Sequence, residues 1–586
     1  MSRRALGLAA FVAALALLPV LAPQFWVTLG NYIGLYSIVT LGLVLLTGVA
    51  GQTSFGQAAF VGLGAYATAY LSTKYGTSPW LALAVGIAIT LVVALTLGFI
   101  TLRMKGHYLP LATIAWGISL YFLFGNLEFL GGHTGMTGIP SLDIFGLELR
   151  DERRYFYLIW AVALAALWAT DNLLDSRPGR AIRALKGGLE MAEAFGVDGA
   201  RLKIVAFVYA ALLACISGWL YAHLQRFVNP TPFGIPQGIE YLFMAVVGGA
   251  GSVWGAVVGA TLITLLKEML QDALPRLLGR SGNFEMVVFG VLIVLLLQFA
   301  RDGLWPLVAR VLPRRAPAPV PDAPPLPKRE APAGAGPLLE VRNARKQFGG
   351  LVAVGGLSFS IARGEILGLI GPNGAGKSTT FSLISGALAL SGGEIVFRGE
   401  SIGSSAPYEV ARRGIGRTFQ HVKLIPQMTV LDNVALGAYL RGSAGIVRAA
   451  LRLDRADEAR TRAEARRAIE RVGLGAAMFE AAGSLALGQQ RVVEIARALA
   501  ADPSLLLLDE PAAGLRHKEK QALADVLRSL RASGMSILLV EHDMDLVMDI
   551  CDHIVVMEFG THLMEGTPAE VQQSPKVRAA YLGTEH

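Results

Sequence analysis

The sequence predicts two unlike parts, a polytopic α-helical membrane domain of about ten helices and a soluble α/β domain that follows it. Three observations lead to this prediction. Apolar residues make up 53% of the 586-residue chain and charged residues only 16%, with a mean hydropathy of +0.50. Long uncharged runs fill the chain up to about residue 312, and an ordinary soluble pattern begins after residue 337. Between them, nine prolines fall within 25 residues.

Composition also excludes several classes of protein. A chain of this length exceeds what one hydrophobic core supports, so a single small soluble domain is excluded. The two cysteines, Cys215 and Cys551, are too few for a disulfide framework or a cysteine-rich metal site. The net charge of +8 could indicate a nucleic-acid partner, but in a membrane protein excess Lys and Arg more often sets orientation. We therefore expect a lipid bilayer as partner and no nucleic acid.

We expect three segments: a membrane domain over 1–312, a linker over 313–337 and a soluble domain over 338–586. The linker composition favours extended polyproline II and cannot form a core. It predicts a tether that spans at most about 78 Å, at roughly 3.1 Å per residue.

Apolar runs of suitable length predict the membrane helices. A signal peptide is the alternative for the first run, but no cleavage site followed by a soluble stretch is evident. One further run, 239–266, is too long for a single helix and has a glycine-rich middle, 248–255, so we expect two short helices that turn round inside the membrane. The other runs are 5–21, 32–50, 55–71, 80–102, 108–125, 155–170, 204–224 and 284–300.

Orientation follows from charge. We expect both ends of this domain on the inner side of the membrane, so the chain should cross the membrane an even number of times. We also expect some of its helices to be broken or re-entrant. The predicted inner segments (1–4, 103–107, 172–203 and 301–315) hold 14 Lys and Arg, and the outer segments (73–79, 126–154, 225–238 and 268–283) hold seven. This excess agrees with the positive-inside rule.

The soluble part contains a phosphate-binding motif. An apolar run over 366–370 is followed by a glycine-rich loop and a helical pattern, which is the strand, loop and helix order of a P-loop. Backbone N–H groups and the positive end of the helix would hold the β-phosphate, Lys377 would neutralise the β and γ oxygens, and Ser378 would ligate Mg²⁺. The nucleotide-binding residues that we predict here are Gly371, Pro372, Asn373, Gly374, Ala375, Gly376, Lys377, Ser378 and Thr379.

Two further predicted strands end in polar groups. The run 505–508 leads into Asp509 and Glu510, and the run 537–540 leads into Glu541 and His542. Strand ends of a parallel sheet meet at one edge, where Asp509 would hold Mg²⁺, Glu510 would polarise the attacking water and His542 would reach the γ-phosphate. A lone histidine at a strand end is more often solvated, but the preceding motifs favour the functional interpretation.

The segment 339–583 resembles the nucleotide-binding subunit of an ABC transporter. The resemblance implies that Phe348 stacks on adenine, that Gln420 in Arg-Thr-Phe-Gln is the Q-loop glutamine that meets Mg²⁺, and that 485–491 is the signature loop. Ala486, Gly488 and Gln489 of that loop would face a nucleotide held by another subunit. Short motifs such as Phe-Gly-Gly-Leu at 348–351 and Ala-Tyr-Leu-Gly at 580–583 are similar to one subfamily, the Liv-type importers of branched-chain amino acids.

This sequence departs from the family pattern at two places. Ala486 stands where the family has Ser, which removes a hydroxyl that would bond the γ-phosphate, so we expect a weakened composite site. Arg516 and His517 stand where Asn-Pro is expected, which leaves the start of the next helix in doubt.

The membrane part resembles the permease of the same importers. A polar, glycine-rich stretch over 48–65 predicts a translocation path at Gln52, Ser54 and Gln57. The alternative is close helix packing by small residues, with the amides bonded to neighbouring backbone. The loop 171–203 would be the coupling helix that docks near the Q-loop; its alternative is a solvated charged loop.

By this resemblance the chain is an ATP-driven importer subunit, a permease fused to its ATP-hydrolysing cassette, in the bacterial inner membrane with the cassette in the cytoplasm. It implies ATP and Mg²⁺, a second permease and a second ATP-binding subunit (related partners or a twin), and a periplasmic solute-binding protein. Alternatives are an importer of another small solute (urea, amides or aromatic acids), an ABC exporter, and a regulatory ABC ATPase with a membrane anchor. The short cytoplasmic loops favour import over export.

Overall fold

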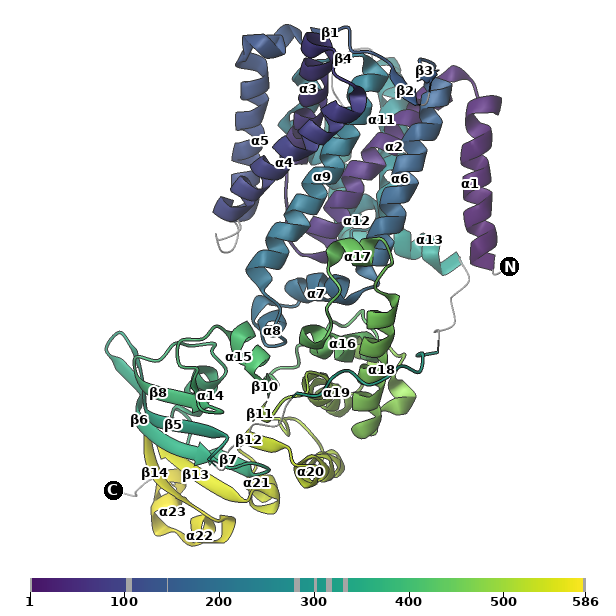
Figure 1. Cartoon of the computed structure of the whole chain (residues 1–586). Helices are drawn as coiled ribbons and strands as arrows, with labels where there is room; N and C mark the ends of the chain where they lie inside the picture. Colours follow the sequence, from purple (N-terminus) through teal and green to yellow (C-terminus); the bar gives the residue numbers. More distant parts are fainter. Residues whose placement is uncertain are drawn as a thin grey trace. The chain divides into compact units, whose positions relative to one another are not determined.

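The computed structural model describes residues 3–101, 108–144, 146–278, 285–299, 303–311, 319–329 and 336–582. The chain forms two compact units (Figure 1). The first comprises Met1–Asp175, Ala200–Ala316 and Ala449–Arg452, and the second comprises Ser176–Gly199, Pro317–Arg448 and Leu453–His586. The loop predicted to couple the two parts therefore packs with the second unit.

The first unit is helical. α2 (Gln24–Leu43) continues into a π-helical turn, η1 (Val44–Val49). Two small antiparallel pairs of strands also occur, β1 (Met136–Thr137) with β4 (Phe227–Val228) and β2 (Leu142–Ile144) with β3 (Leu147–Leu149). The remaining helices are α1 (Arg3–Leu21), α3 (Gln57–Tyr75), α4 (Pro79–Thr101), α5 (Tyr108–Asn126), α6 (Glu152–Leu174), α9 (Gly199–Gln225), α10 (Ile235–Gly248), α11 (Val253–Leu278), α12 (Glu285–Phe299) and α13 (Trp305–Val311).

These helices are suited to a membrane. Within the described residues, six are long and apolar enough to cross one: Gln24–Val49, Pro79–Thr101, Tyr108–Asn126, Glu152–Leu174, Gly199–Gln225 and Val253–Ala273. Val92, Phe99 and Leu111 each expose more than half of their surface. Apolar surface of this extent is expected against lipid rather than water. The even number of crossings stays a prediction, and Leu102, 103–107, 279–284 and 300–302 of the predicted runs and loops lie outside the described residues.

The predicted break in the run 239–266 is confirmed, because α10 ends at Gly248 and α11 begins at Val253. The prediction of two short helices is wrong for the second, which has 26 residues. The predicted apolar run ended at Leu266, before a charged residue. Lys267 stays within the helix because its Nζ donates to Glu240 Oε2 of α10 at 2.8 Å, and a paired charge costs little at that position.

The second unit is built on a six-stranded sheet in the order β10-β11-β12-β7-β13-β14, in which β14 alone is antiparallel to its neighbour. Its strands are β7 (Ile366–Ile370), β10 (Ile415–Arg417), β11 (Leu505–Asp509), β12 (Ser536–Val540), β13 (His553–Glu558) and β14 (Thr561–Gly566). β7, β11 and β12 are covered on both faces, which explains their continuous apolar runs. These three strands lie side by side, so their carboxyl ends meet at one edge.

A second sheet and two groups of helices complete this unit. The sheet is antiparallel, in the order β6-β5-β8-β9, with strands β5 (Leu339–Phe348), β6 (Leu351–Ile361), β8 (Gly392–Phe397) and β9 (Glu400–Ser401). The helices around the sheets are α14 (Lys377–Ile384), α15 (Pro407–Arg413), α20 (His517–Ala532), α21 (Met544–Ile550), α22 (Pro568–Gln573) and α23 (Pro575–Leu582). The others are α7 (Arg177–Lys186), α8 (Leu189–Glu193), α16 (Val430–Gly437), η5 (Ala438–Arg441), α17 (Ile446–Ala450), α18 (Arg455–Arg471) and α19 (Leu487–Ala500).

The break between α10 and α11 yields a test. A Cβ on Gly248 would lie 1.8 Å from the carbonyl oxygen of Gly255, so the two helix backbones touch there. We expect Gly248→Ala to separate them at a cost of about 1 to 3 kcal/mol or more and to lower the yield of folded protein severalfold. Gly251→Ala is the matched control, because a Cβ there meets nothing within 4 Å. Size-exclusion chromatography and thermal unfolding in detergent measure both, and equal behaviour of the two variants would contradict the close contact.

Candidate functional site

The phosphate loop has the predicted geometry. β7 ends at Ile370, and α14 begins at Lys377 with Gly376 as its N-terminal cap. Gly376 has a φ of +94°, and a Cβ on it would lie 2.5 Å from the carbonyl oxygen of Ala353. Only glycine fits this position, because the backbone conformation is left-handed and a neighbouring strand approaches closely. The predicted order of strand, loop and helix is confirmed.

Lys377 reaches back across this loop. Its side chain is buried, and Nζ donates to the carbonyl oxygens of Gly371 at 2.7 Å and Pro372 at 3.0 Å. Burial lowers the pKa of Lys377, although Glu510 and Asp509 act in the opposite direction. A buried ammonium held only by neutral carbonyls is poorly compensated, so this position favours an anionic ligand such as a phosphate.

Glu510 lies at the centre of a cluster formed by three separate loops. Its Oε1 lies 2.8 Å from His542 Nε2, and its Oε2 accepts a hydrogen bond from Gln420 Nε2 at 3.0 Å. Glu510 has a φ of +46° and donates its N–H to the carbonyl of Val540 at 2.8 Å, which fixes the carboxylate between its two partners. The structure therefore brings together the three residues that the sequence predicts as catalytic.

Asp509 lies deeper than Glu510. Burial first, and then the charge of Glu510, raises the pKa of Asp509 to about 6. Its Oδ1 is buried and has no hydrogen-bond partner among the described residues. A carboxylate oxygen in this situation fits a cation or an ordered water beside the phosphate loop.

A pocket of about 590 Å³ contains most of the predicted nucleotide site. Gly371, Pro372 and Asp509 are not among its lining residues. Four lining residues were not predicted: Leu351, Val352, Ala353 and Phe559. Phe559 lies in the turn between β13 and β14. This turn is held against β6, because the Gly355 N–H donates to the Gly560 carbonyl oxygen at 2.7 Å. The two residues are far apart in the sequence, so no local pattern predicts that Phe559 lines the pocket. The predicted residues in the lining are Phe348, Asn373, Gly374, Ala375, Gly376, Lys377, Ser378, Thr379, Gln420, Glu510 and His542.

The predicted signature residues do not line this pocket. Ala486 precedes α19 as its N-terminal cap, and Gly488 and Gln489 form the first turn of that helix. Ala486 has no side-chain acceptor for the first turn, but its own N–H donates to Gln489 Oε1 at 3.3 Å.

The start of α20, which the sequence left in doubt, is regular. It begins at His517, and Glu519 Oε2 accepts the N–H of Arg516 at 2.8 Å.

Sequence reasoning missed a residue that supports Gln420. Arg491 on α19 is buried, and its guanidinium donates to the carbonyl oxygens of Phe419, at 2.8 Å, and Gln420. Arginine carries several donors in a fixed fork, so it can hold two consecutive carbonyls at once. The glutamine loop is thereby attached to the helix that begins at the signature residues. Arg491 closes the stretch that we interpreted as the signature loop, but nothing in the pattern indicated this contact.

The predicted coupling segment packs on the helices of the second unit. Arg180 of α7 is 2% exposed and donates through both terminal nitrogens to the carboxylate of Glu458 on α18. Burial alone would raise the pKa of Glu458, but Arg180 and Arg462 outweigh it and hold that pKa below its usual range. Lys423, three residues after Gln420, pairs with Glu190 of α8 at 3.2 Å. The expectation of docking near the Q-loop is confirmed, and a solvated loop is excluded.

In the first unit, Gln52, Ser54 and Gln57 are all buried. Both polar atoms of the Gln52 and Gln57 amides lack hydrogen-bond partners within the described part of the chain. The alternative is therefore borne out only in part: the amides bond no neighbouring backbone among the described residues, but small residues do pack closely, since a Cβ on Gly64 would lie 2.2 Å from the carbonyl oxygen of Cys215. Unpaired buried amides cost about 1 to 3 kcal/mol each, so their presence favours contact with water or solute.

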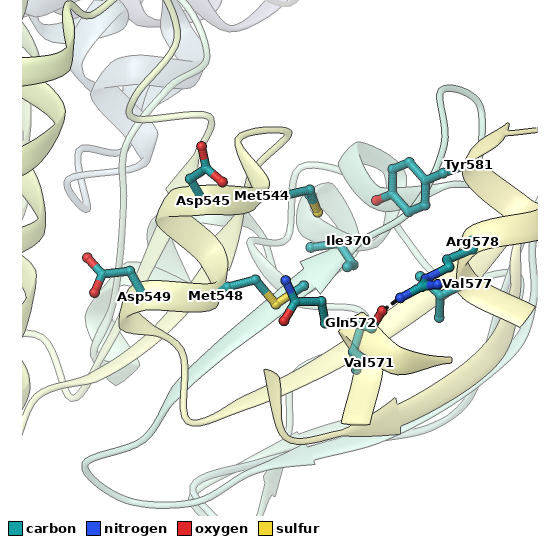
Figure 2. Close-up of a pocket in the computed structure, with 10 residues that line it drawn as sticks. All are labelled: Ile370, Met544, Asp545, Met548, Asp549, Val571, Gln572, Val577, Arg578 and Tyr581. Carbon is teal, nitrogen blue, oxygen red and sulfur yellow. Dashed lines mark hydrogen bonds between the residues drawn. The ribbon is translucent and has the colours of Figure 1, made fainter. Parts of the chain in front are cut away.

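A second cavity of about 600 Å³ lies beside α21, α22 and α23 (Figure 2). Its lining is mostly apolar, with Ile370, Met544 and Met548 among the contributors and Tyr581 at its edge. In Figure 2 Asp545 and Asp549 point away from Tyr581, and an ion pair joins Asp549 to Arg528. None of the predicted site residues lines this cavity, so it is separate from the nucleotide pocket.

Comparison with known proteins places both parts of the chain. A family described as "Branched-chain amino acid transport system / permease component" matches residues 25–297, "ABC transporter" matches 354–513, and "Branched-chain amino acid ATP-binding cassette transporter" matches 562–586. The high-affinity branched-chain amino acid transport ATP-binding protein LivG of Salmonella typhimurium is 42% identical over 250 residues, which are 42% of this chain and 98% of LivG. The chain belongs to the branched-chain amino acid ABC transporter family. BraF of Pseudomonas aeruginosa, with the same printed description, is 40% identical over the same shares.

The chain is thus a permease component and an ATP-binding cassette fused in one polypeptide, and its cassette couples ATP hydrolysis to transport. It is a multi-pass membrane protein that binds ATP, and an ABC system of this kind implies partner subunits. Among solved structures, a nucleotide-free ATP-binding cassette from an ABC transporter is 32% identical and covers 42% of this chain and all of that chain, with a TM-score of 0.38.

The first test of the site concerns Ala486. We expect Ala486→Ser to raise ATPase activity of the assembled complex by about tenfold at limiting ATP, because a hydrogen bond to a charged group contributes about 1.5 to 3 kcal/mol. Ala486→Gly is the matched control. Glycine caps a helix almost as well as serine but offers no hydroxyl, so it separates capping from phosphate contact. Equal rates for the wild type and the serine variant would contradict a missing contact.

The second test concerns Arg180. Removal of one partner from a buried ion pair costs about 3 to 5 kcal/mol, so Arg180→Ala should detach α7 from α18 and lower transport at least tenfold. Glu190→Ala removes the other pair of this segment, whose side chains are 72% and 34% exposed, and should change transport less than twofold. Solute uptake and ATPase are measured on the same reconstituted preparations. Equal losses in the two variants would show that Arg180 has no special role.

Proposed function

We propose that this chain imports branched-chain amino acids across the bacterial inner membrane, as the fused permease and ATPase subunit of an ABC importer. The observation that carries the proposal is one polypeptide that matches the permease family over 25–297 and also holds Lys377, Gln420, Glu510 and His542 around one pocket. The printed functions of LivG and BraF support the substrate class.

The geometry supports a division of labour among the pocket residues. Phe348 offers an exposed ring at the pocket edge for the adenine base. Backbone N–H groups of the loop 371–379 and the ammonium of Lys377 hold the β- and γ-phosphates. Ser378, Gln420 and Asp509 would hold Mg²⁺, which neutralises charge on the phosphates when it is bound. The buried Oδ1 of Asp509 without a partner supports this assignment.

Hydrolysis needs a group that orients water beside the γ-phosphate. Glu510 occupies that place in the proposal and accepts the proton of the attacking water while the bond between the γ-phosphorus and its bridging oxygen breaks. His542 lies 2.8 Å from Glu510 and would contact the γ-phosphate once nucleotide separates the pair. Gln420 contacts the other oxygen of Glu510 and thereby links the reaction centre to the loop that Arg491 fixes.

A complete site requires a second cassette. Ala486, Gly488 and Gln489 lie outside the pocket of their own cassette, which supports their action on a nucleotide held by another subunit. We therefore propose a complex with a second permease and a second ATP-binding subunit, either related proteins or a twin of this chain, and a periplasmic solute-binding protein outside. Measurement of the native mass of the purified complex distinguishes the twin from the related partners.

The identity of the solute is a separate question from the function of the ATP-binding cassette. The ribose import ATP-binding protein RbsA of Rhodococcus jostii is 33% identical over 243 residues, so similar cassettes serve unlike solutes. Within the first unit, Gln52, Ser54 and Gln57 are the proposed contacts of the translocation path. Competition of labelled leucine uptake by isoleucine and valine, with urea, amides and aromatic acids as alternatives, decides the class.

The proposal predicts a strict dependence on two residues. In proteoliposomes with all partners and a binding protein, we expect Lys377→Ala or Glu510→Gln to lower leucine uptake at least a hundredfold. Lys377→Ala removes the positive charge that compensates the phosphates, and Glu510→Gln removes the proton acceptor. Glu510→Gln should still bind ATP in a filter assay. Asp525→Asn, an exposed acid-to-amide change on α20, is the control and should transport normally. Normal uptake by both site variants would overturn the proposal.

A further inference from the structure

The Pro-rich segment predicted as a free tether is attached to the second unit where the structure describes it. Residues 319–329 run along α18 and η5, and their backbone carbonyls accept hydrogen bonds from arginine side chains. Arg460 donates to Pro325 at 3.2 Å, and Arg441 donates to Leu326 at 3.1 Å and Pro327 at 3.3 Å. Arg466 donates to Asp322 at 2.6 Å. Weaker contacts at 3.5 Å join Arg466 to Val320 and Arg467 to Ala323.

The chemistry of the two surfaces is complementary. Proline has no N–H, and an extended segment makes no internal hydrogen bonds, so its carbonyls are free to accept. Arginine has five donors and no acceptor. A face with Arg441, Arg460, Arg466 and Arg467 therefore suits a proline-rich strand better than it suits a helix or a hairpin, whose carbonyls are already occupied.

One apolar side chain anchors the segment. Leu326 is 2% exposed, although it lies among residues that are mostly exposed, including Pro324 and Lys328. Burial of the leucine side chain adds a hydrophobic contribution to the hydrogen bonds from the charged arginines around it. The backbone carbonyl of Leu326 is held by Arg441 at the same point, so packing and hydrogen bonding coincide.

The far end of the segment contacts a different part of the unit. The Arg329 N–H donates to Asp502 Oδ2 at 2.5 Å, and its guanidinium donates to the carbonyls of Asp502 at 3.3 Å and Arg412 at 2.5 Å. Asp502 lies in the turn between α19 and β11, and its φ is +53°. Arg412 is near the end of α15. The segment thus joins α18 and η5 to the turn that leads from α19 into β11, the strand that carries Asp509.

We propose that residues 319–329 are a docked brace, which fastens the arginine-lined helical face to the sheet at Asp502 and sets the angle of α19. Docking also shortens the tether. Between Val311 at the end of α13 and residue 319 the chain spans eight residue steps, which reach about 28 Å when fully extended. That is well under half of the reach expected for a free linker of 25 residues.

Docking is tested by the accessibility of single cysteines. The two native cysteines are buried, so Leu326→Cys and Pro324→Cys can be compared in the intact chain with its partners. We expect maleimide to label Leu326→Cys at least tenfold more slowly than Pro324→Cys. Equal labelling rates would overturn the docked position. This readout needs no transport and stands apart from the proposed substrate.

The mechanical role is tested by the amount of solute moved per ATP hydrolysed in proteoliposomes. We expect Leu326→Glu to lower this ratio at least threefold, because an undocked brace lets the helical face move without the sheet. Pro324→Glu introduces the same charge at an exposed position and should match the wild type. Arg329→Ala removes the guanidinium contacts to Asp502 and Arg412 but keeps the backbone N–H bond to Asp502, so it weakens this end of the segment; it should lower the ratio as well and serves if Leu326→Glu folds poorly.

The labelling and transport measurements test two separate claims, that the segment is docked and that it acts as a brace. An unchanged ratio in both Leu326→Glu and Arg329→Ala would overturn the brace even if the segment is docked. This second test rests on the proposed function, because it measures transport. Absence of leucine transport by the wild type would count against the substrate, whereas slow labelling at position 326 would still support the docked segment.

Discussion

The reaction centre depends on one constraint, the meeting of parallel strand ends at a single edge of the sheet. β7, β11 and β12 are neighbours, so the residues that follow them, from the phosphate loop to Glu510 and His542, share one pocket although they are far apart in the chain. Glu510 then receives hydrogen bonds from two sides, from Gln420 and from His542. A carboxylate held in this way loses little orientation entropy when water binds, as the proposed proton abstraction by Glu510 requires.

The second unit also supports the proposal that a second cassette completes the site. The helix α19 presents its first turn, with Ala486 and Gly488, away from the pocket of its own cassette, while its next turns hold the Gln420 loop through Arg491. One helix therefore joins the proposed surface for another subunit to the nucleotide pocket. In the proposal, a movement at the first turn of α19 would reach Gln420 through the buried Arg491.

Local patterns predicted the elements and most of the pocket, because strand runs, glycine loops and terminal acids are short-range signals. Long-range contacts were not predictable. Phe559 joins the pocket through a hairpin contact with β6, and Lys267 continues α11 because Glu240 is nearby in space. Composition also misled at 319–329, since proline content indicates an extended chain but says nothing of a matching arginine surface. Each feature that the sequence did not predict depends on a partner that is far away in the sequence.

The buried amides of Gln52 and Gln57 bear on the permease in the same physical terms. A folded protein is stable by about 5 to 15 kcal/mol in total, so two amides whose buried atoms lack partners are a considerable cost. The glycines of the stretch 48–65 pack closely against neighbouring helices, because a Cβ on Gly64 would lie 2.2 Å from the carbonyl oxygen of Cys215. Such a cost persists where the groups exchange hydrogen bonds with molecules that pass, because water or solute then satisfies them transiently. The proposed translocation path through the polar stretch between η1 and α3 would offset this cost.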